Sequence, residues 1–160
     1  MVILWFRGSL TDIGVPGVRI ITLNVNGIRA AARKQFFDWL PTQDADVVCL
    51  QETRAQPEQR KAPEFSPEGY QTYYVDAERK GYSGVAIYSR SEPDRVTEGL
   101  GWKSFDREGR WVQVDYGRLS VVSVYMPSGT SGDERLDFKY RIMKKMKPLL
   151  KRFVNGERDY

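Results

Sequence analysis

Short apolar runs recur along the chain and predict β-strands. The most continuous one lies within residues 46–53, where Val47 to Leu50 lead without a polar break to Gln51 and Glu52. Such a run is typical of a strand buried on both faces, and it also fits one turn of a buried helix. By the same pattern we expect further strands at residues 18–23, 70–75, 84–89, 95–98, 110–116 and 119–125, the last two forming a hairpin.

Two other stretches carry helical periodicity. Residues 28–40 contain a run of alanines and an apolar side, and Pro41 is expected to end this helix. Residues 133–153 are amphipathic, and we expect Pro148 to kink or interrupt that helix. Its basic face is interpreted as solvated rather than as a phosphate-binding surface. The apolar positions at helical spacing in this segment are Leu136, Tyr140, Met143, Met146, Leu150 and Phe153.

The order strand, helix, strand over residues 18–50 is that of two parallel strands joined by a crossover. Residues 1–17 do not fit this pattern, because glycines and a proline interrupt them just before residue 18. We expect these residues to be an irregular extension, or the product of a start codon assigned too early. Their apolar burst at residues 2–6 is too short for a signal sequence or a membrane span, so the cytoplasm is the expected location.

Composition narrows the chemistry. The 160 residues carry 25 Lys and Arg against 21 Asp and Glu, a net charge of +4 that permits a nucleic-acid partner without requiring one. The sequence has no histidine, which excludes a Ser-His-Asp triad and imidazole ligands from this chain. Any metal is therefore expected to have oxygen ligands, as Mg²⁺, Mn²⁺ and Ca²⁺ prefer. Cys49 is the only cysteine and lies in the apolar run, so we expect a core residue and a reducing compartment.

Polar side chains stand at the ends of three predicted strands. Asn24 and Asn26 follow the first strand, Glu52 follows the second, and Tyr125 ends the last. Asparagine orients water or a phosphate oxygen, glutamate holds a hard divalent cation, and a tyrosine hydroxyl donates to a phosphoryl oxygen. Together they indicate a metal-assisted phosphoester site. The alternative is a set of turn-forming asparagines, an exposed acid and a half-buried tyrosine, and the residues taken alone favour this alternative.

Five segments, in this order along the chain, resemble the exonuclease III family of Mg²⁺-dependent exodeoxyribonucleases and apurinic/apyrimidinic endonucleases of DNA base-excision repair. The wider endonuclease/exonuclease/phosphatase superfamily, which includes deoxyribonuclease I and inositol-phosphate phosphatases, shares the Asn and Gln-Glu elements. The segments are LNVNGIRAAA (23–32), LQETR (50–54), GYSGVAIYSR (81–90), EGRWVQVDY (108–116) and VYMPSG (124–129).

This resemblance implies a four-layer α/β sandwich of the deoxyribonuclease I-like type, with two sheets face to face and helices outside. It implies Mg²⁺ as the cofactor, with Mn²⁺ as a substitute, and duplex DNA with abasic sites or 3′ ends as the substrate. The implied roles are metal binding for Glu52 and Asn24, catalysis for Tyr125 and Asn26, and DNA binding or support of the site for Tyr82 and Arg110.

The chain departs from the family pattern by ending before the GD-[FW]-N motif and the later Asp-rich and Asp-His segments. We therefore expect residues 18–160 to be the N-terminal half of an endonuclease/exonuclease/phosphatase domain, with an apolar sheet face left open. On its own this half is expected to be inactive or nearly so. Two alternatives stay open: a non-catalytic DNA-binding or assembly module completed by a partner or a second copy, and a phosphatase of the same superfamily.

Overall fold

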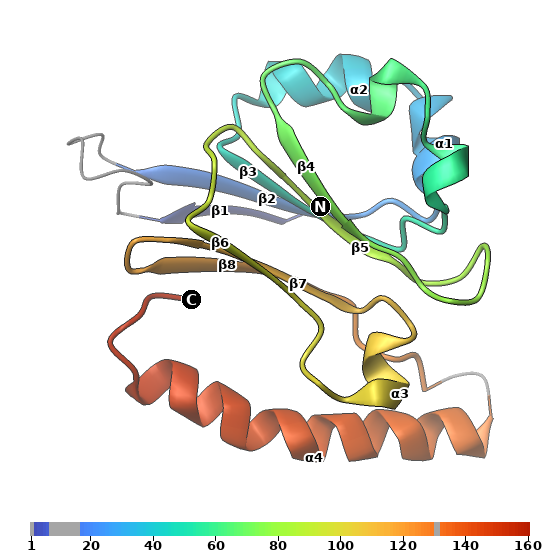
Figure 1. The fold of residues 1–160 in the computed structure, drawn as a ribbon, viewed down its shortest axis with the longest axis vertical. Coiled ribbons are helices and arrows are strands. Elements are labelled where there is room, and N and C mark those ends of the chain that lie inside the picture. The colour runs from blue at the N-terminus through green and yellow to red at the C-terminus, as the bar shows by residue number, and fades with distance from the viewer. Residues whose placement is uncertain (1, 7–16, 130–131) are drawn as a thin grey trace.

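The computed structural model describes residues 2–6, 17–129 and 132–160, and these form four stacked layers (Figure 1). The outer layers are short helices on one side and one long helix on the other, and two sheets lie between them. The mixed α/β composition predicted from the apolar pattern is confirmed. Among the described residues, no helix combines the length and the hydropathy that a membrane crossing requires.

The first sheet has the strand order β1-β2-β3-β5-β4. Strands β2 and β3 are parallel, as predicted, and the other neighbouring pairs are antiparallel. The bounds are β1 Val2–Phe6, β2 Val18–Asn24, β3 Val47–Gln51, β4 Gln71–Val75 and β5 Val85–Ser89. The irregular extension expected for residues 1–17 is wrong for Val2–Phe6, which pair with β2, whereas residues 1 and 7–16 lie outside the described part of the chain.

The second sheet is antiparallel, with the order β6-β7-β8. Its strands are β6 Arg95–Glu98, β7 Trp111–Tyr116 and β8 Leu119–Val124, and the predicted hairpin is β7–β8. Residues on alternate sides of β3 explain its unbroken apolar run. Val47 and Cys49 pack against the second sheet, and Val48 and Leu50 pack beneath the short helices.

The short-helix layer differs from the single helix predicted over residues 28–40. Helices α1 (Ile28–Ala32) and α2 (Phe36–Trp39) are separated by Gln35, whose φ of 61° is incompatible with a continuous right-handed helix. Short 3₁₀ turns follow at Leu40–Gln43, Pro57–Gln59 and Pro63–Phe65.

On the opposite side lies the short helix α3 (Lys103–Asp106), and α4 (Asp133–Asn155) continues through Pro148. Pro148 removes only one helical hydrogen bond, and the turn that carries the freed carbonyl is exposed, so that carbonyl is accessible to solvent.

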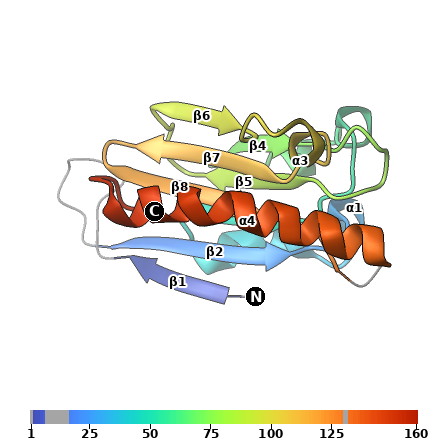
Figure 2. The same cartoon turned by 90° about the horizontal axis from the view of Figure 1, so that it is seen from below.

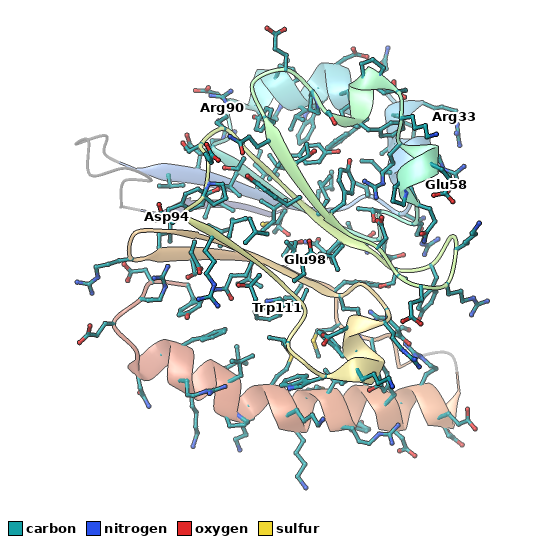
Figure 3. All side chains as sticks on the ribbon, in the orientation of Figure 1. Arg33, Glu58, Arg90, Asp94, Glu98 and Trp111 are labelled. Atoms are coloured by element: carbon teal, nitrogen blue, oxygen red, sulfur yellow. The ribbon has the colours of Figure 1, made fainter. Side chains whose placement is uncertain are left out.

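Helix α4 buries a face that only partly matches the predicted one, with Met146 and Phe153 common to both. The α4 side chains that pack on the second sheet are Phe138, Ile142, Met146, Leu149 and Phe153. Trp111 of β7, labelled in Figure 3, belongs to the same apolar cluster. Tyr140 is 59% exposed and Met143 48% exposed, although both belong to the predicted apolar stripe. Two apolar stripes run along α4, and only the position of the second sheet decides which one is buried.

The second sheet ends at β8, whereas the first sheet continues past it to β2 and β1 (Figure 2). An apolar cavity of about 460 Å³ lies along this edge, between the first sheet and α4. Among the described residues, the outer edge of β8 is paired only at its start, where the Ser120 N–H donates to the Asp159 carbonyl at 2.7 Å. The sequence leads us to expect an open apolar sheet face. In the described part of the chain this face is smaller, a groove lined by Ile20, Thr22, Val122, Val124, Met146 and Leu150.

Candidate active site

The ends of three strands bring the predicted site residues together. Asn24 ends β2 and Glu52 follows β3, and because these strands are parallel their carboxyl ends share one edge, with Asn24 in register with Gln51. Tyr125 follows β8 in the other sheet. The two sheets are tied at this edge by the Ser123 hydroxyl, which donates to the Leu50 carbonyl at 3.0 Å. Residues from both sheets therefore converge on Glu52.

The Glu52 carboxylate is the centre of this cluster, and the Glu52 side chain is only 11% exposed. Its Oε1 accepts a hydrogen bond from Asn24 Nδ2 at 2.6 Å. The carboxylate also accepts a hydrogen bond from the Tyr125 hydroxyl. Arg54 forms an ion pair with Oε2. Asn24 lies at the end of β2, Tyr125 directly after β8, and Arg54 two residues after Glu52. The three donors therefore hold the carboxylate from separate directions.

The backbone at Glu52 is held in a sparsely populated conformation. Its φ is 56°, in the left-handed region that non-glycine residues rarely adopt. The carbonyl of Glu52 accepts from the Gly27 N–H at 2.7 Å, and the Thr53 N–H donates to the Gly84 carbonyl at 3.1 Å. These hydrogen bonds on both sides stabilise the turn that directs the carboxylate toward the strand ends. A residue held in a sparsely populated backbone conformation, as Glu52 is, often lies at a functional site.

The side chain of Asn24 has a defined orientation. Its Oδ1 accepts from the backbone N–H of Asn26 at 3.0 Å, so its amide nitrogen faces Glu52. Asn26 has a φ of 47° and is exposed. The LNVNG segment therefore forms a turn that presents one asparagine to the carboxylate and the other to solvent.

The cluster lowers the pKa of Glu52 and raises the pKa of Tyr125. Burial alone raises the pKa of Glu52, but the hydrogen bonds from Asn24 and Tyr125 and the charge of Arg54 outweigh it, and the pKa lies below its usual value. Burial, with the neighbouring Glu52 carboxylate, raises the pKa of Tyr125 to about 12. At neutral pH the cluster thus holds an ionised carboxylate beside a protonated phenol.

A second set of polar residues supports Tyr125 from behind. Arg110 is 1% exposed, and its Nη1 donates to the Tyr125 carbonyl at 2.8 Å. Its Nη2 donates to the Tyr82 hydroxyl at 3.1 Å, and its Nε pairs with Glu108 at 2.6 Å. Because all these donors face protein acceptors, the geometry favours support of Tyr82 and Tyr125 over DNA binding, and both predicted roles of Arg110 stay predictions.

The donors at this site fit a hard divalent cation. Glu52 supplies an ionised carboxylate, and Mg²⁺ is commonly held by one or two carboxylates while it keeps several waters. The Asn24 amide turns its nitrogen to Glu52, and its oxygen accepts from the Asn26 N–H. In the described residues no group of three acidic, histidine or cysteine side chains could form a closed metal cage.

Three residues of the site have no counterpart among the predicted ones: Arg54, Glu108 and Arg135. Arg54 and Glu108 lie inside the LQETR and EGRWVQVDY segments, so their positions beside Glu52 and Arg110 are the signal for them. Arg135 carries no such signal, because 27 residues separate it from Glu108 and only the fold brings the two together. The individual roles of the predicted residues stay predictions.

Comparison with known proteins agrees with this architecture. Residues 21–151 match the sequence profile of the Endonuclease/Exonuclease/phosphatase family. The exodeoxyribonuclease of Bacillus subtilis (strain 168) is 41% identical over 123 residues, which cover 76% of this chain and 48% of that relative. The DNA-(apurinic or apyrimidinic site) endonuclease of Dictyostelium discoideum is 33% identical over 125 residues, covering 78% of this chain and 34% of the relative.

A solved structure gives the same result for the fold. An AP endonuclease from Archaeoglobus fulgidus superposes with a TM-score of 0.70 at 28% identity, covering 81% of this chain and 49% of that one. This likeness confirms the predicted deoxyribonuclease I-like α/β sandwich. The chain spans about half the length, or less, of the relatives it matches. Since the family profile extends over residues 21–151, the chain belongs to the Endonuclease/Exonuclease/phosphatase family.

Proposed function

We propose that this chain carries the metal-binding and phosphate-contacting half of a DNA repair nuclease that hydrolyses phosphodiester bonds at abasic sites or from 3′ ends. The observation that carries this proposal is the convergence of Glu52, Asn24 and Tyr125 at one edge of the two sheets. The names of the relatives, an exodeoxyribonuclease and AP endonucleases, support DNA as the substrate.

In this proposal each polar residue has one task. Glu52 and Asn24 bind Mg²⁺, which when present neutralises charge on the scissile phosphate and on the leaving oxygen. Tyr125 donates a hydrogen bond from its hydroxyl to a phosphoryl oxygen. Its raised pKa supports this role, because the phenol stays protonated at neutral pH. Asn26, exposed beside the cluster, orients the attacking water or a phosphoryl oxygen.

Duplex DNA is the proposed partner of the surface around this cluster. The loop between β4 and β5 carries exposed Arg79 and Lys80, and Tyr82 from the same loop contacts Arg110 behind Tyr125. Such a pairing of cations and aromatic rings suits a phosphate backbone. Tyr82 therefore keeps its predicted role at the DNA surface. The free, buried thiol of Cys49 supports the cytoplasmic location that belongs to this proposal.

Metal binding provides the first test. We expect Mn²⁺, followed by electron paramagnetic resonance, to bind one site in the unmodified chain, and Glu52→Gln to lose that site. Asp94→Asn is a matched control, because Asp94 lies at the far end of the second sheet, where it accepts from the Gly117 N–H. Equal Mn²⁺ binding by Glu52→Gln and the unmodified chain would refute the metal role of Glu52.

Hydrolysis provides the second test. With Mg²⁺ and a labelled duplex containing one abasic site, we expect this chain to turn over far more slowly than the Bacillus subtilis exodeoxyribonuclease. The reason is that Glu52, Asn24 and Tyr125 would contact the scissile phosphate of the substrate on one side and leave its other side without a protein contact. A rate near that of the relative would show that the chain is complete for catalysis and would contradict this expectation.

A second candidate function, an assembly module, is favoured by the apolar groove beside β8. An extended segment of another polypeptide or of a second copy would pair with the free edge of β8 and cover Ile20 and Val122. Size-exclusion chromatography with light scattering tests this alternative. A stable dimer that binds DNA without cutting it would favour the assembly module over the nuclease.

A further inference from the structure

Glu108, Arg110, Arg135 and Tyr82 form a closed set of hydrogen bonds that joins three parts of the fold. Both arginines donate to the Tyr82 hydroxyl, Arg110 Nη2 at 3.1 Å and Arg135 Nη2 at 2.8 Å. Both also pair with the Glu108 carboxylate, Arg110 through Nε at 2.6 Å and Arg135 through Nη1 at 2.7 Å. The set thus links the start of α4 and the residues before β7 to the loop between β4 and β5.

The β4–β5 loop has a specialised backbone around this anchor. Gly81 and Ser83, on either side of Tyr82, both adopt positive φ, at 71° and 45°. At the tip, the guanidinium of Arg79 lies 5.5 Å from the centroid of the Tyr82 ring. The Tyr82 hydroxyl is therefore a side-chain anchor near the exposed, basic tip of the loop. Backbone hydrogen bonds hold the two ends of the loop, from the Glu78 N–H to the Arg107 carbonyl and from the Arg54 N–H to the Ser83 carbonyl, both at 2.9 Å.

Arg135 is committed to protein partners rather than to solvent. Its terminal nitrogens make three hydrogen bonds, to Glu108 Oε1 at 2.7 Å, to Glu108 Oε2 at 3.0 Å and to the Tyr82 hydroxyl at 2.8 Å. Its guanidinium also lies 4.7 Å from the centroid of the Phe138 ring. An arginine fixed on two terminal nitrogens and against a ring is a poor phosphate contact, because binding a phosphate would break these bonds.

We propose that Glu108 and Arg135 are positioning residues that hold Tyr82, and through it the β4–β5 loop, in the conformation that meets duplex DNA. This inference rests on the proposed function, since DNA is the ligand of that loop. Fixing the loop in advance removes the ordering cost that binding would otherwise include. Loss of the anchor therefore weakens DNA binding without removing a phosphate contact.

The test compares Arg135→Ala, Tyr82→Phe and the double variant. Affinity is measured by fluorescence anisotropy of a labelled duplex with a tetrahydrofuran abasic-site analogue, in EDTA and at several KCl concentrations. The matched controls are Arg141→Ala, which removes an exposed arginine from the same helix, and Tyr73→Phe, which removes a hydroxyl that donates to Gln71.

We expect each single variant to bind about three- to tenfold more weakly, and the double variant to be no weaker than either, because both changes remove one anchor. The slope of log affinity against log salt stays unchanged in Arg135→Ala. The two controls bind like the unmodified chain. Melting temperatures are recorded in parallel, and Arg135→Lys, which keeps the charge but not the forked contact, replaces Arg135→Ala if that variant does not fold.

Two results would overturn the inference. Additive losses with a salt slope reduced by about 0.9 in Arg135→Ala would mean that Arg135 binds a phosphate itself. Unchanged affinity in Tyr82→Phe would mean that the loop needs no anchor. Failure of the unmodified chain to bind the duplex is a separate outcome, because it refutes the proposed function and removes the ligand on which this inference depends.

Discussion

Replacing Arg110 with methionine tests how the protein stabilises a buried charge behind Tyr125. Arg110 is 1% exposed and makes an ion pair with Glu108 and hydrogen bonds with Tyr125 and Tyr82. Methionine keeps the unbranched stem, so most of the packing remains and the lost hydrogen bonds dominate the effect. The variant leaves the Glu108 carboxylate with a single arginine partner and the Tyr125 carbonyl without its donor.

The expected loss of stability can be worked out from these contacts. Removing one partner of a buried ion pair costs about 3–5 kcal/mol, and the lower end applies because Glu108 keeps Arg135. An unsatisfied carbonyl adds about 1 kcal/mol. The sum, about 4 kcal/mol, lowers the urea midpoint by about 2 M if the m-value is about 2 kcal/mol/M.

The control for this prediction is Arg90→Met. Arg90 pairs with Asp44, whose side chain is 82% exposed, so its loss is expected to cost less than about 1 kcal/mol. Urea unfolding followed by tryptophan fluorescence measures both variants. If Arg110→Met unfolds within about 1 kcal/mol of Arg90→Met, then Arg135 or water replaces the lost contacts and the reasoning is refuted.

Two further predictions concern the supports of the site. Gly84→Ala is expected to destabilise the fold by about 1–3 kcal/mol more than the control Gly117→Ala. Both glycines have positive φ, but only at Gly84 would the new Cβ clash with Thr53 Oγ1. Equal unfolding midpoints of the two variants would contradict this prediction. Glu108→Gln is expected to cost about 2 kcal/mol at pH 7. Because Arg135 and Arg110 outweigh burial and hold the pKa of Glu108 below its usual 4.5, the stability of the ionised carboxylate is present above pH 4.5 and is lost as the pH falls through the folded value. The gap between Glu108→Gln and the unmodified chain, measured by urea unfolding, should therefore shrink below pH 4.5, and a constant gap would show that the charge is not responsible.

Much of the candidate site followed from local pattern. The apolar run before Glu52 predicts a doubly buried strand, and its parallel pairing with the strand before Asn24 predicts that their carboxyl ends meet. The hairpin that ends at Tyr125 is signalled by alternation and a tight turn. What the pattern does not contain is the packing of the hairpin over β3, which brings Tyr125 to Glu52.

The features that were not predicted depend on contacts between distant segments. Arg135 reaches Glu108 only because α4 begins beside α3, and the choice of buried face on α4 depends on where the second sheet lies. The break at Gln35 requires a left-handed backbone that alanine-rich neighbours do not signal. In each case local propensity allows more than one arrangement, and tertiary packing selects among them.

The single thiol of the chain lies where the two sheets meet, so it reports on whether they stay together. Cys49 Sγ is buried against the Val122 carbonyl of β8, and burial raises the pKa of the thiol to about 12. Once β7 and β8 separate from the first sheet, the thiol regains an ordinary pKa of about 8.5 and becomes reactive. The rate of alkylation under native conditions therefore measures the free energy of opening the sandwich, separately from global unfolding and without an introduced label.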